Sequence, residues 1–213
     1  MLDALLFTNP PALLRSVYRK CLWSVNTSEQ TIYLTFDDGP VAGITPFVLD
    51  ELKKYDAKAT FFCIGKNIDA NPDIFKRIMD GGHAIGNHSY DHLNGWQTGN
   101  DEYYSNVEKC TETLAAHHAQ NTKALFRPPY GKLKPAQYKF LNERYRIVLW
   151  DVLSFDFDVS LNEERVLNNV ITHAGPGSII VFHDSLKAQP KVEYALPKVL
   201  EYFSAKGFKF EKL

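Results

Sequence analysis

The chain has 213 residues, of which 45% are hydrophobic and 23% are charged, and its formal net charge is -1. This length suits one large domain with a substantial core, and the composition excludes a disordered or fibrous protein. The near-neutral charge, with no basic block in the sequence, argues against a nucleic-acid partner and fits an uncharged substrate.

Residues 1–30 are expected to form an N-terminal extension, which is followed by one domain at 31–213. Apolar residues recur at helical spacing between Leu13 and Leu22, beside three basic side chains. We expect this segment to form a helix that caps the domain. A surface that touches a membrane is the alternative.

The beginning of the chain does not follow the pattern of a secretory signal. Its basic residues, from Arg15 onward, come after the apolar ones rather than before them. No segment is apolar over the length needed to span a bilayer. The location therefore stays unassigned: the missing export signal favours the cytoplasm, and association with a membrane or the cell envelope is the alternative.

From residue 31 onward, strand-like and helix-like segments alternate with short connections. The stretches expected to be strands begin at Thr31, Ala59, His83, Ala124, Arg146, Gly177 and Phe208. This alternation implies a parallel sheet covered by helices, either an open doubly wound sheet or a closed barrel. About seven strands favour an α/β fold with a distorted or incomplete (β/α) barrel.

Several of the helices between these strands have recognisable starts. Thr45-Pro46 and Asn71-Pro72 each place a capping side chain before a proline at the first helical position. Between residues 103 and 114, apolar residues recur on one helical face. Later helices are expected near 135–144, 162–173 and 194–206.

Polar side chains follow the predicted strands at their C-terminal ends. They are Asp37, Asp38, His88, Arg127, Asp151 and His183. In a barrel these strand ends converge on one face, which is where catalytic residues gather. The pattern therefore favours the barrel and predicts an active site at that face.

The adjacent acids Asp37 and Asp38 cannot both stay charged at close range without a cation or a basic partner. His88 and His92 are four residues apart and follow another strand at the same face. One aspartate with this histidine pair is a standard ligand set for zinc or a similar divalent ion. The second aspartate is then free for proton transfer, as in a metal-dependent hydrolase.

Two further side chains suit this face. Arg127 stands before a rigid Pro-Pro turn, and its guanidinium could hold Asp37 charged and oriented. His183 ends a strand and could act as a general acid, because an amine leaving group must gain a proton. A carboxylate would orient His183 and raise its pKa, and the candidates are Asp151, Asp156 and Asp158.

Taken together, these motifs resemble the polysaccharide deacetylase family, which are carbohydrate esterases (family 4) with a NodB homology domain. The resemblance covers residues 31–213 or nearly so. The motifs match at Thr35-Phe36-Asp37-Asp38-Gly39, at His88-Ser89-Tyr90-Asp91-His92 and at Arg127-Pro128-Pro129-Tyr130. Each motif alone is common, but the three in this order are specific.

The resemblance implies a role for each matched residue. Asp37 would be the catalytic base, with Arg127 orienting it, and the backbone N–H of Tyr130 would help to stabilise an oxyanion. One divalent metal ion would be bound by Asp38, His88 and His92. Zinc is expected, and cobalt or another borderline transition metal is the alternative.

Two family motifs are matched with changes. The fourth usually ends in Asp-Trp and reads Asp156-Phe157 here, so Asp156 would orient His183, with Asp151 in reserve. The fifth, usually Leu-x-His, reads Val181-Phe182-His183. Phe157 and Val181, with Tyr130, would contact the substrate and would change the shape of the pocket for the acetyl methyl group.

The resemblance thus implies a metal-dependent hydrolase that removes acetyl groups from N-acetylated sugars of a polysaccharide or oligosaccharide. The alternatives are an O-acetyl esterase of the xylan type, a cyclic-amide hydrolase and a non-catalytic carbohydrate-binding domain. The expected partner is an acetylated glycan, whose identity the sequence does not give. No partner protein is inferred.

Overall fold

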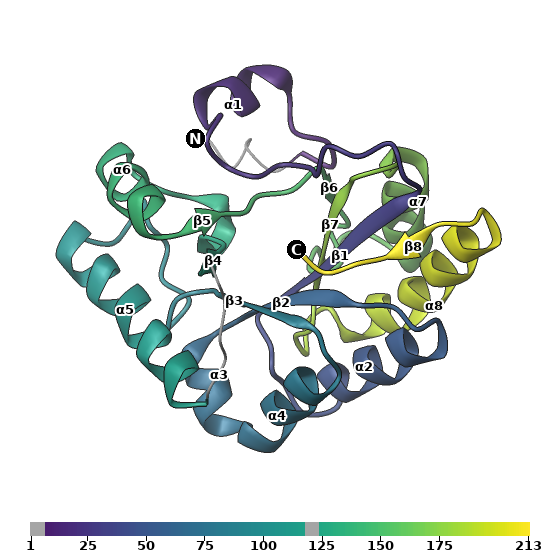
Figure 1. The fold of residues 1–213 in the computed structure, drawn as a ribbon, viewed down its shortest axis with the longest axis horizontal. Coiled ribbons are helices and arrows are strands. Elements are labelled where there is room, and N and C mark those ends of the chain that lie inside the picture. Colours follow the sequence, from purple (N-terminus) through teal and green to yellow (C-terminus); the bar gives the residue numbers. More distant parts are fainter. Residues whose placement is uncertain (1–6, 118–123) are drawn as a thin grey trace.

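A curved sheet of parallel strands forms the centre of the computed structural model, which describes residues 7–117 and 124–213 (Figure 1). Seven strands follow one another in the order β5-β4-β3-β2-β1-β7-β6, and β8 pairs with β1 beside this path. The strands are β1 (Thr31–Asp37), β2 (Ala59–Cys63), β3 (Ala84–Asn87), β4 (Leu125–Phe126), β5 (Arg146–Ile147), β6 (Val152–Leu153), β7 (Ile179–His183) and β8 (Lys209–Phe210). The predicted incomplete (β/α) barrel is confirmed, because β5 and β6 end the path.

One strand prediction is wrong. The strand expected from Arg146 to Trp150 ends at Ile147, and a second short strand, β6, begins at Val152. Asp151 therefore lies just before a strand rather than after one. Its side chain accepts a hydrogen bond from Ser178, which precedes β7, so Asp151 lies at the face opposite to the predicted site.

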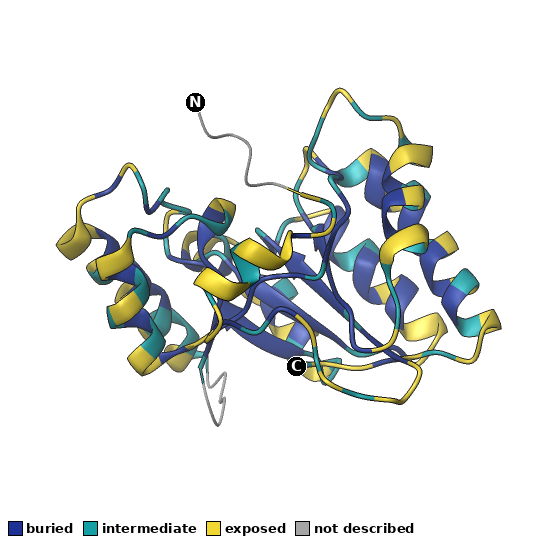
Figure 2. Ribbon diagram, turned by 90° about the horizontal axis from the view of Figure 1, so that it is seen from above, coloured by how far each residue is buried: buried dark blue, intermediate teal, exposed yellow. Residues whose placement is uncertain are grey.

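Helices cover the outer side of the sheet (Figure 1). They are α2 (Ile44–Lys54), α3 (Gly65–Ala70), α4 (Pro72–Asp80), α5 (Asn100–Ala116), α6 (Pro135–Arg144), α7 (Glu163–His173) and α8 (Gln189–Ala205). Figure 2 shows that the strands and the inner helix faces are buried, whereas the outer helix faces are exposed. The apolar stripe of each helix therefore faces the sheet, as expected for amphipathic helices in this architecture.

The start of α2 differs from the prediction. The helix begins at Ile44, two residues before the predicted first helical position at Pro46, and the side chain of Thr45 does not cap it. Instead the Thr45 hydroxyl accepts the N–H of Val41 and donates to the carboxylate of Asp184. A tertiary contact has replaced the local cap.

The other helix starts agree in part. α4 begins at Pro72 as predicted, but the amide of Asn71 donates to the carbonyls of Pro40 and Asn67 and does not cap the helix. α8 begins at Gln189, earlier than the expected 194. The short helix α3 has no counterpart among the predicted elements.

The N-terminal extension spans the gap between β5 and β6; its first six residues lie outside the described part. Leu22 donates its N–H to the carbonyl of Ile147 and accepts the N–H of Leu149, each at 2.8 Å. Near the other edge, Thr8 accepts the N–H of Leu153, also at 2.8 Å. The extension thus supplies hydrogen-bond partners that a closed barrel would take from a neighbouring strand.

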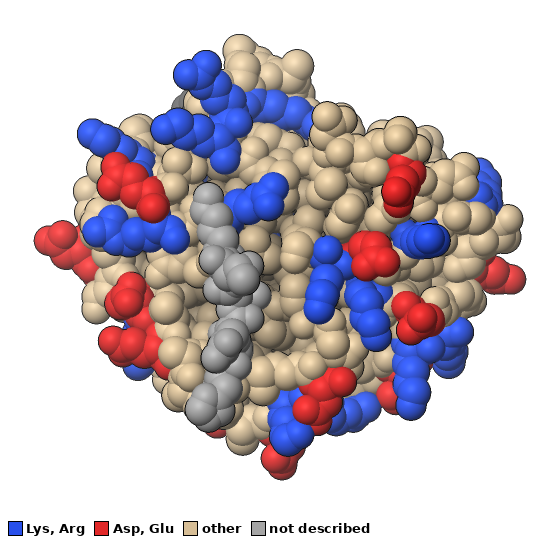
Figure 3. Space-filling view, in the orientation of Figure 1, with Lys and Arg blue, Asp and Glu red and all other residues tan. Residues whose placement is uncertain are grey.

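The extension contains the helix α1 (Ala12–Val17). This helix is shorter than predicted, because the apolar repeat continues to Leu22. Leu13 and Val17 on this helix are exposed, whereas the later Cys21 and Trp23 are buried in the core. Figure 3 shows Lys and Arg side chains gathered over this end of the molecule, and mixed with Asp and Glu elsewhere on the same face. No helix in the described ranges is long and apolar enough to cross a membrane.

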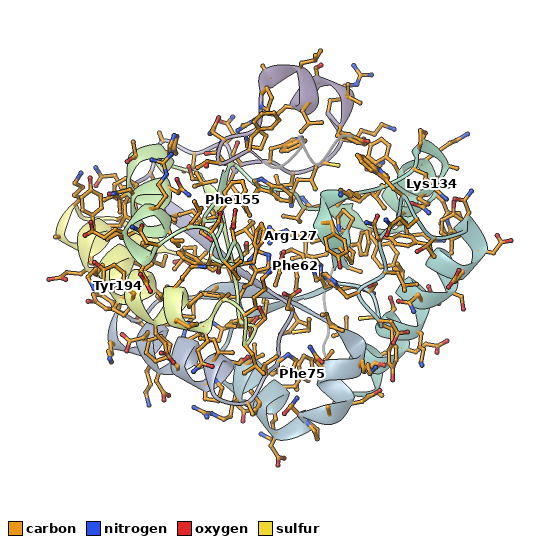
Figure 4. All side chains as sticks on the ribbon, turned by 180° about the vertical axis from the view of Figure 1, so that it is seen from behind. Phe62, Phe75, Arg127, Lys134, Phe155 and Tyr194 are labelled. Carbon is orange, nitrogen blue, oxygen red and sulfur yellow. The ribbon has the colours of Figure 1, made fainter. Side chains whose placement is uncertain are left out.

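Gly86 in β3 leaves room for the buried ring of Phe62, which in turn lies 4.1 Å beneath the guanidinium of Arg127 (Figure 4). A Cβ atom on Gly86 would lie 2.3 Å from Cδ1 of this ring. Gly86→Ala is therefore expected to reduce the free energy of unfolding by about 1–3 kcal/mol, as overpacked cores do. Urea denaturation measures the change.

Gly175→Ala is the matched control, because an added Cβ there meets no atom within 4 Å. Its stability should stay within about 0.5 kcal/mol of the wild type. Equal stability of the Gly86 and Gly175 variants would contradict the packing argument.

Candidate active site

The predicted site residues lie around one cavity of about 520 Å³ at the C-terminal ends of the strands. Asp37 ends β1, His88 follows β3, Arg127 follows β4, and His183 ends β7. The cavity wall contains Asp37, Asp38, His88, His92, Tyr130, Trp150, Leu153, Phe157, Val181 and His183, whereas Arg127 is fully buried and reaches the site through its contact with Asp37. Asp151 is absent from this wall, because it lies at the opposite face. Apart from Asp151, the topology of the sheet therefore brings all the predicted strand-end residues together.

Asp38, His88 and His92 form a candidate metal centre, with one ligand atom of each within 4.8 Å of the others. Oδ1 of Asp38 lies 3.7 Å from Nε2 of His88 and 3.3 Å from Nε2 of His92. This oxygen is buried and has no hydrogen-bond donor among the described residues. A buried carboxylate oxygen without a donor is costly, and a cation bound by the three side chains would satisfy it.

Burial disfavours the charged form of both histidines, which suits metal ligands because these bind through a neutral imidazole. Nδ1 of His88 donates to the carbonyl of Arg127 at 2.7 Å, which leaves Nε2 with a lone pair that faces Asp38. Burial, with the nearby His92, lowers the pKa of His88 to about 3. Burial also lowers the pKa of His92, against the opposing charge of Asp38.

Two asparagines hold the loop between these histidines, which needs support because Ser89 and His92 have φ values of 62° and 58°. Asn87 accepts the N–H of Ser89 at 2.7 Å. Asn106 on α5 accepts the N–H groups of Tyr90 and Asp91, at 2.9 and 3.0 Å. Neither residue was predicted from the sequence. For Asn87 the available signal was the tendency of Asn side chains to bond to the turn backbone two residues on, whereas Asn106 binds backbone far away in the sequence.

Arg127 and Asp37 form a buried ion pair, with Nη1 of the arginine 2.7 Å from Oδ1 of the aspartate. Nη1 also donates to the hydroxyl of Thr35, while Nη2 and Nε donate to the carbonyls of Leu149 and Val148. Burial lowers the pKa of Arg127, and the charge of Asp37 opposes this change. The predicted contact between Arg127 and Asp37 is present; it holds Oδ1 of Asp37, while Oδ2 lies 4.0 Å from Nε2 of His88.

Asp156 is the carboxylate that contacts His183. Its Oδ1 lies 2.7 Å from Nδ1 of the imidazole, and its Oδ2 accepts the backbone N–H of the same residue at 2.6 Å. Asp151, the reserve candidate, pairs with Arg15 instead, and Asp158 bonds to Ser160 at the surface.

The electrostatics of this pair favour a protonated imidazole. Burial alone would lower the pKa of His183, but the charge and the hydrogen bond of Asp156, with Asp38 and Asp37 farther off, raise it to about 9. His183 is therefore able to donate a proton from Nε2 into the cavity near neutral pH.

The remaining predicted residues shape the cavity. Tyr130 lies in the short 3-10 helix η2 (Pro129–Gly131), with φ of 59°, and its ring is 4.7 Å from that of His92. Phe157 packs edge-on against the ring of His183 at 5.0 Å, and Val181 is buried on the same wall. Together with Leu153 they give an apolar pocket beside the polar groups.

A sequence model of the family described as polysaccharide deacetylase matches residues 24–144, which is more than half of the chain. The chain belongs to this family. The match covers the first three motifs named above, from the double aspartate to Arg127 and Tyr130. The resemblance inferred from the sequence is thereby confirmed.

Named relatives of this polysaccharide deacetylase act on glycans. It is 38% identical over 185 residues to a peptidoglycan-N-acetylglucosamine deacetylase of Bacillus cereus, which covers 85% of this chain and 66% of the relative. It is 35% identical over 164 residues to a chitooligosaccharide deacetylase of Azorhizobium caulinodans, covering 75% of this chain and 76% of the relative. The chain thus spans about two thirds or more of these proteins.

A crystal structure of the Bc1960 peptidoglycan N-acetylglucosamine deacetylase, in complex with 4-naphthalen-1-yl-N-oxidanyl-benzamide, has the same fold. It superimposes with a TM-score of 0.86 at 35% sequence identity and covers 95% of this chain and 94% of that chain. The two structures therefore match over almost the whole length of both chains.

Asp156→Asn should move the alkaline limit of activity to lower pH. The variant removes the charge that keeps His183 protonated, so burial then dominates and the imidazole loses its proton at a lower pH. We expect kcat/KM to fall by about 100-fold at pH 8 and by less at pH 6, because only the protonated imidazole is a general acid.

The pH profile of kcat/KM measures this effect. Asp158→Asn serves as the control, since its carboxylate is exposed and bonds only to nearby Ser160 among the described contacts. An unchanged alkaline limit in the Asp156 variant would refute the assignment.

Proposed function

We propose that this polysaccharide deacetylase removes acetyl groups from N-acetylated amino sugars of a glycan, with zinc as its metal ion. One observation carries the proposal. A three-ligand metal centre, a carboxylate paired with arginine and a histidine paired with aspartate all face one cavity of about 520 Å³. This combination offers a binding site for a metal ion, together with a base and an acid for the hydrolysis of an amide.

The donor set of the metal centre suits a borderline divalent ion. Two imidazole nitrogens and one carboxylate oxygen are the ligands expected for a catalytic zinc, and the cavity leaves room for a further ligand. When bound, such an ion lowers the pKa of a coordinated water to about 7 and polarises a carbonyl group. Cobalt or another borderline transition metal would fit the same donors.

Asp37 is the base of the proposed reaction. Its Oδ1 is held by Arg127, while Oδ2 lies 4.0 Å from Nε2 of His88, at the edge of the metal centre. From this position Asp37 accepts the proton of the attacking water. The ion pair with Arg127 fixes the orientation of the carboxylate before the reaction begins.

His183 is the acid on the other side of the cavity. It donates its proton to the amine as the bond between nitrogen and the acetyl carbon breaks, and Asp156 stabilises the imidazolium before that step. The backbone N–H of Tyr130 assists with the charge on the carbonyl oxygen. The apolar wall of Leu153, Phe157 and Val181 receives the methyl group of the acetyl.

The substrate is an acetylated glycan, in line with the named activities of the relatives. An O-acetyl esterase would use the same residues. However, an ester's leaving group needs less help from an acid than an amine does, and Asp156 holds His183 ready to give a proton. A non-catalytic binding domain would need neither of the two buried charge pairs.

Two aspartate variants separate the roles of metal ligand and base. Asp38→Ala should lose both bound zinc and activity, because one of three ligands is removed. Asp37→Asn should keep its zinc and lose about 100-fold or more in kcat, since a general base contributes on this scale. Metal analysis by mass spectrometry and acetate release are the two measurements.

His173→Gln is the matched control for these variants. His173 is exposed on α7 and bonds to a carbonyl of its own helix, so the change should leave zinc content and activity unaltered. Wild-type turnover in Asp37→Asn would show that another group is the base.

The substrate class is tested by acetate release from N-acetylglucosamine oligomers, peptidoglycan and O-acetylated xylan. We expect release from the N-acetylated glycans and a loss of about 100-fold for them in His183→Ala, with a milder loss for the ester. Faster hydrolysis of the xylan by the wild type would instead favour the esterase.

A further inference from the structure

Asp184 is a buried carboxyl group that the proposed reaction does not use. It follows His183 directly at the end of β7, and its side chain is fully buried. Burial raises its pKa to about 8, against the hydrogen bond from Thr45. A buried carboxyl is costly, so its partners indicate what it does.

The hydrogen bonds that Asp184 makes to other described residues join it to residues 37–45, which include the two active-site aspartates and the start of α2. Its backbone N–H donates to the carbonyl of Asp37 at 3.0 Å. Its Oδ1 accepts the N–H of Gly39 at 3.0 Å, and its Oδ2 accepts the hydroxyl of Thr45 at 2.5 Å. Asp184 therefore forms hydrogen bonds to the backbone of the residues on both sides of Asp38.

The fit at Gly39 is close. A Cβ atom at this position would lie 1.9 Å from Oδ2 of Asp184, so the carboxyl group occupies the space that any side chain would need. Thr45 braces the same group, because its hydroxyl also accepts the N–H of Val41. The carboxyl thus has a fixed position relative to β1 and α2.

Asp38 needs such support. Its φ of 84° is in the left-handed region, which a non-glycine residue adopts at a cost of roughly 1–3 kcal/mol. From the other side, Asn67 donates to the carbonyl of Asp38 at 2.7 Å, and Ile64 donates to that of Gly39 at 3.0 Å. The backbone is held between these donors and Asp184.

We propose that Asp184 is a positioning residue for the metal centre: its carboxyl group, braced by Thr45, fixes the turn at Gly39 so that the Asp38 carboxylate faces His88 and His92. Asp184 touches neither substrate nor metal and acts through the backbone next to Asp38. The identity of the ion rests on the proposed function, but the hydrogen bonds that position Asp38 do not.

Three variants test this role by zinc affinity, measured in competition with a fluorescent zinc indicator. Asp184→Ala removes both hydrogen bonds and should weaken zinc binding by about 10- to 100-fold, as lost support of a ligand does. Thr45→Val leaves Oδ2 of Asp184 without its donor and should weaken zinc binding in the same direction. Asp184→Asn keeps an acceptor for Gly39 and a polar group for Thr45, and should bind zinc nearly as the wild type does.

Val166→Ala controls for a general loss of stability. Val166 is fully buried in the hydrophobic core on α7, which packs on α8 and β6, and neither of these elements carries a metal ligand. The variant should unfold at a lower temperature and keep its zinc affinity. This separates a positioning role from a merely structural one.

Wild-type zinc affinity in Asp184→Ala and Thr45→Val would overturn the proposal, as would a loss in Asp184→Asn equal to that in Asp184→Ala. If Asp184→Ala does not fold, Thr45→Val decides alone.

A second readout is independent of the metal. The amide of Gly39 should exchange with solvent at least about 10-fold faster in metal-free Asp184→Ala than in the wild type, because its acceptor is gone. Should the wild type bind no zinc, the proposed function fails, and unchanged exchange at Gly39 would overturn the positioning role separately.

Discussion

The buried ion pair between Arg127 and Asp37 is the interaction on which the rest of the structure depends. Moving a guanidinium into the interior costs roughly several kcal/mol unless its charge and its donors are satisfied. Here the acceptors are Asp37 and Thr35 of β1 and two carbonyls of the segment after β5. These segments meet only because the sheet curves. The curvature of the sheet and the charge balance at the site therefore depend on each other.

The same pair explains how two adjacent aspartates can serve one cavity. Along a regular strand, Asp37 and Asp38 would point to opposite faces of the sheet. The left-handed φ of Asp38 breaks this alternation where β1 ends, and both carboxylates line the cavity. Arg127 then satisfies the first, and the two histidines place the second where a cation would be held. Their mutual repulsion is resolved by backbone geometry as much as by partners.

Some site residues could be predicted from the sequence because the topology of the sheet places them, whereas others are placed by tertiary contacts. His88 and His183 were placed correctly because parallel strands bring their C-terminal ends together, whatever the side chains nearby. Asp151 was misplaced because that rule needs the strand boundaries, and a new strand starts directly after it. Asn106 and Asp184 gave no local signal, since the backbone groups they bind come from distant parts of the chain. Such tertiary contacts cannot be predicted from the spacing of residues along the sequence.

The N-terminal extension bears on the site although none of its described residues lines the cavity. An incomplete barrel leaves the chain after β5 without a neighbouring strand, and this is the chain whose carbonyls bind Arg127. Leu22 supplies the missing pairing, because it bonds to the backbone on both sides of Val148. The carbonyl of Leu149 thus reaches Arg127 from a segment held by the extension. The orientation of the proposed base is therefore linked, through two backbone contacts and one guanidinium, to residues far outside the site.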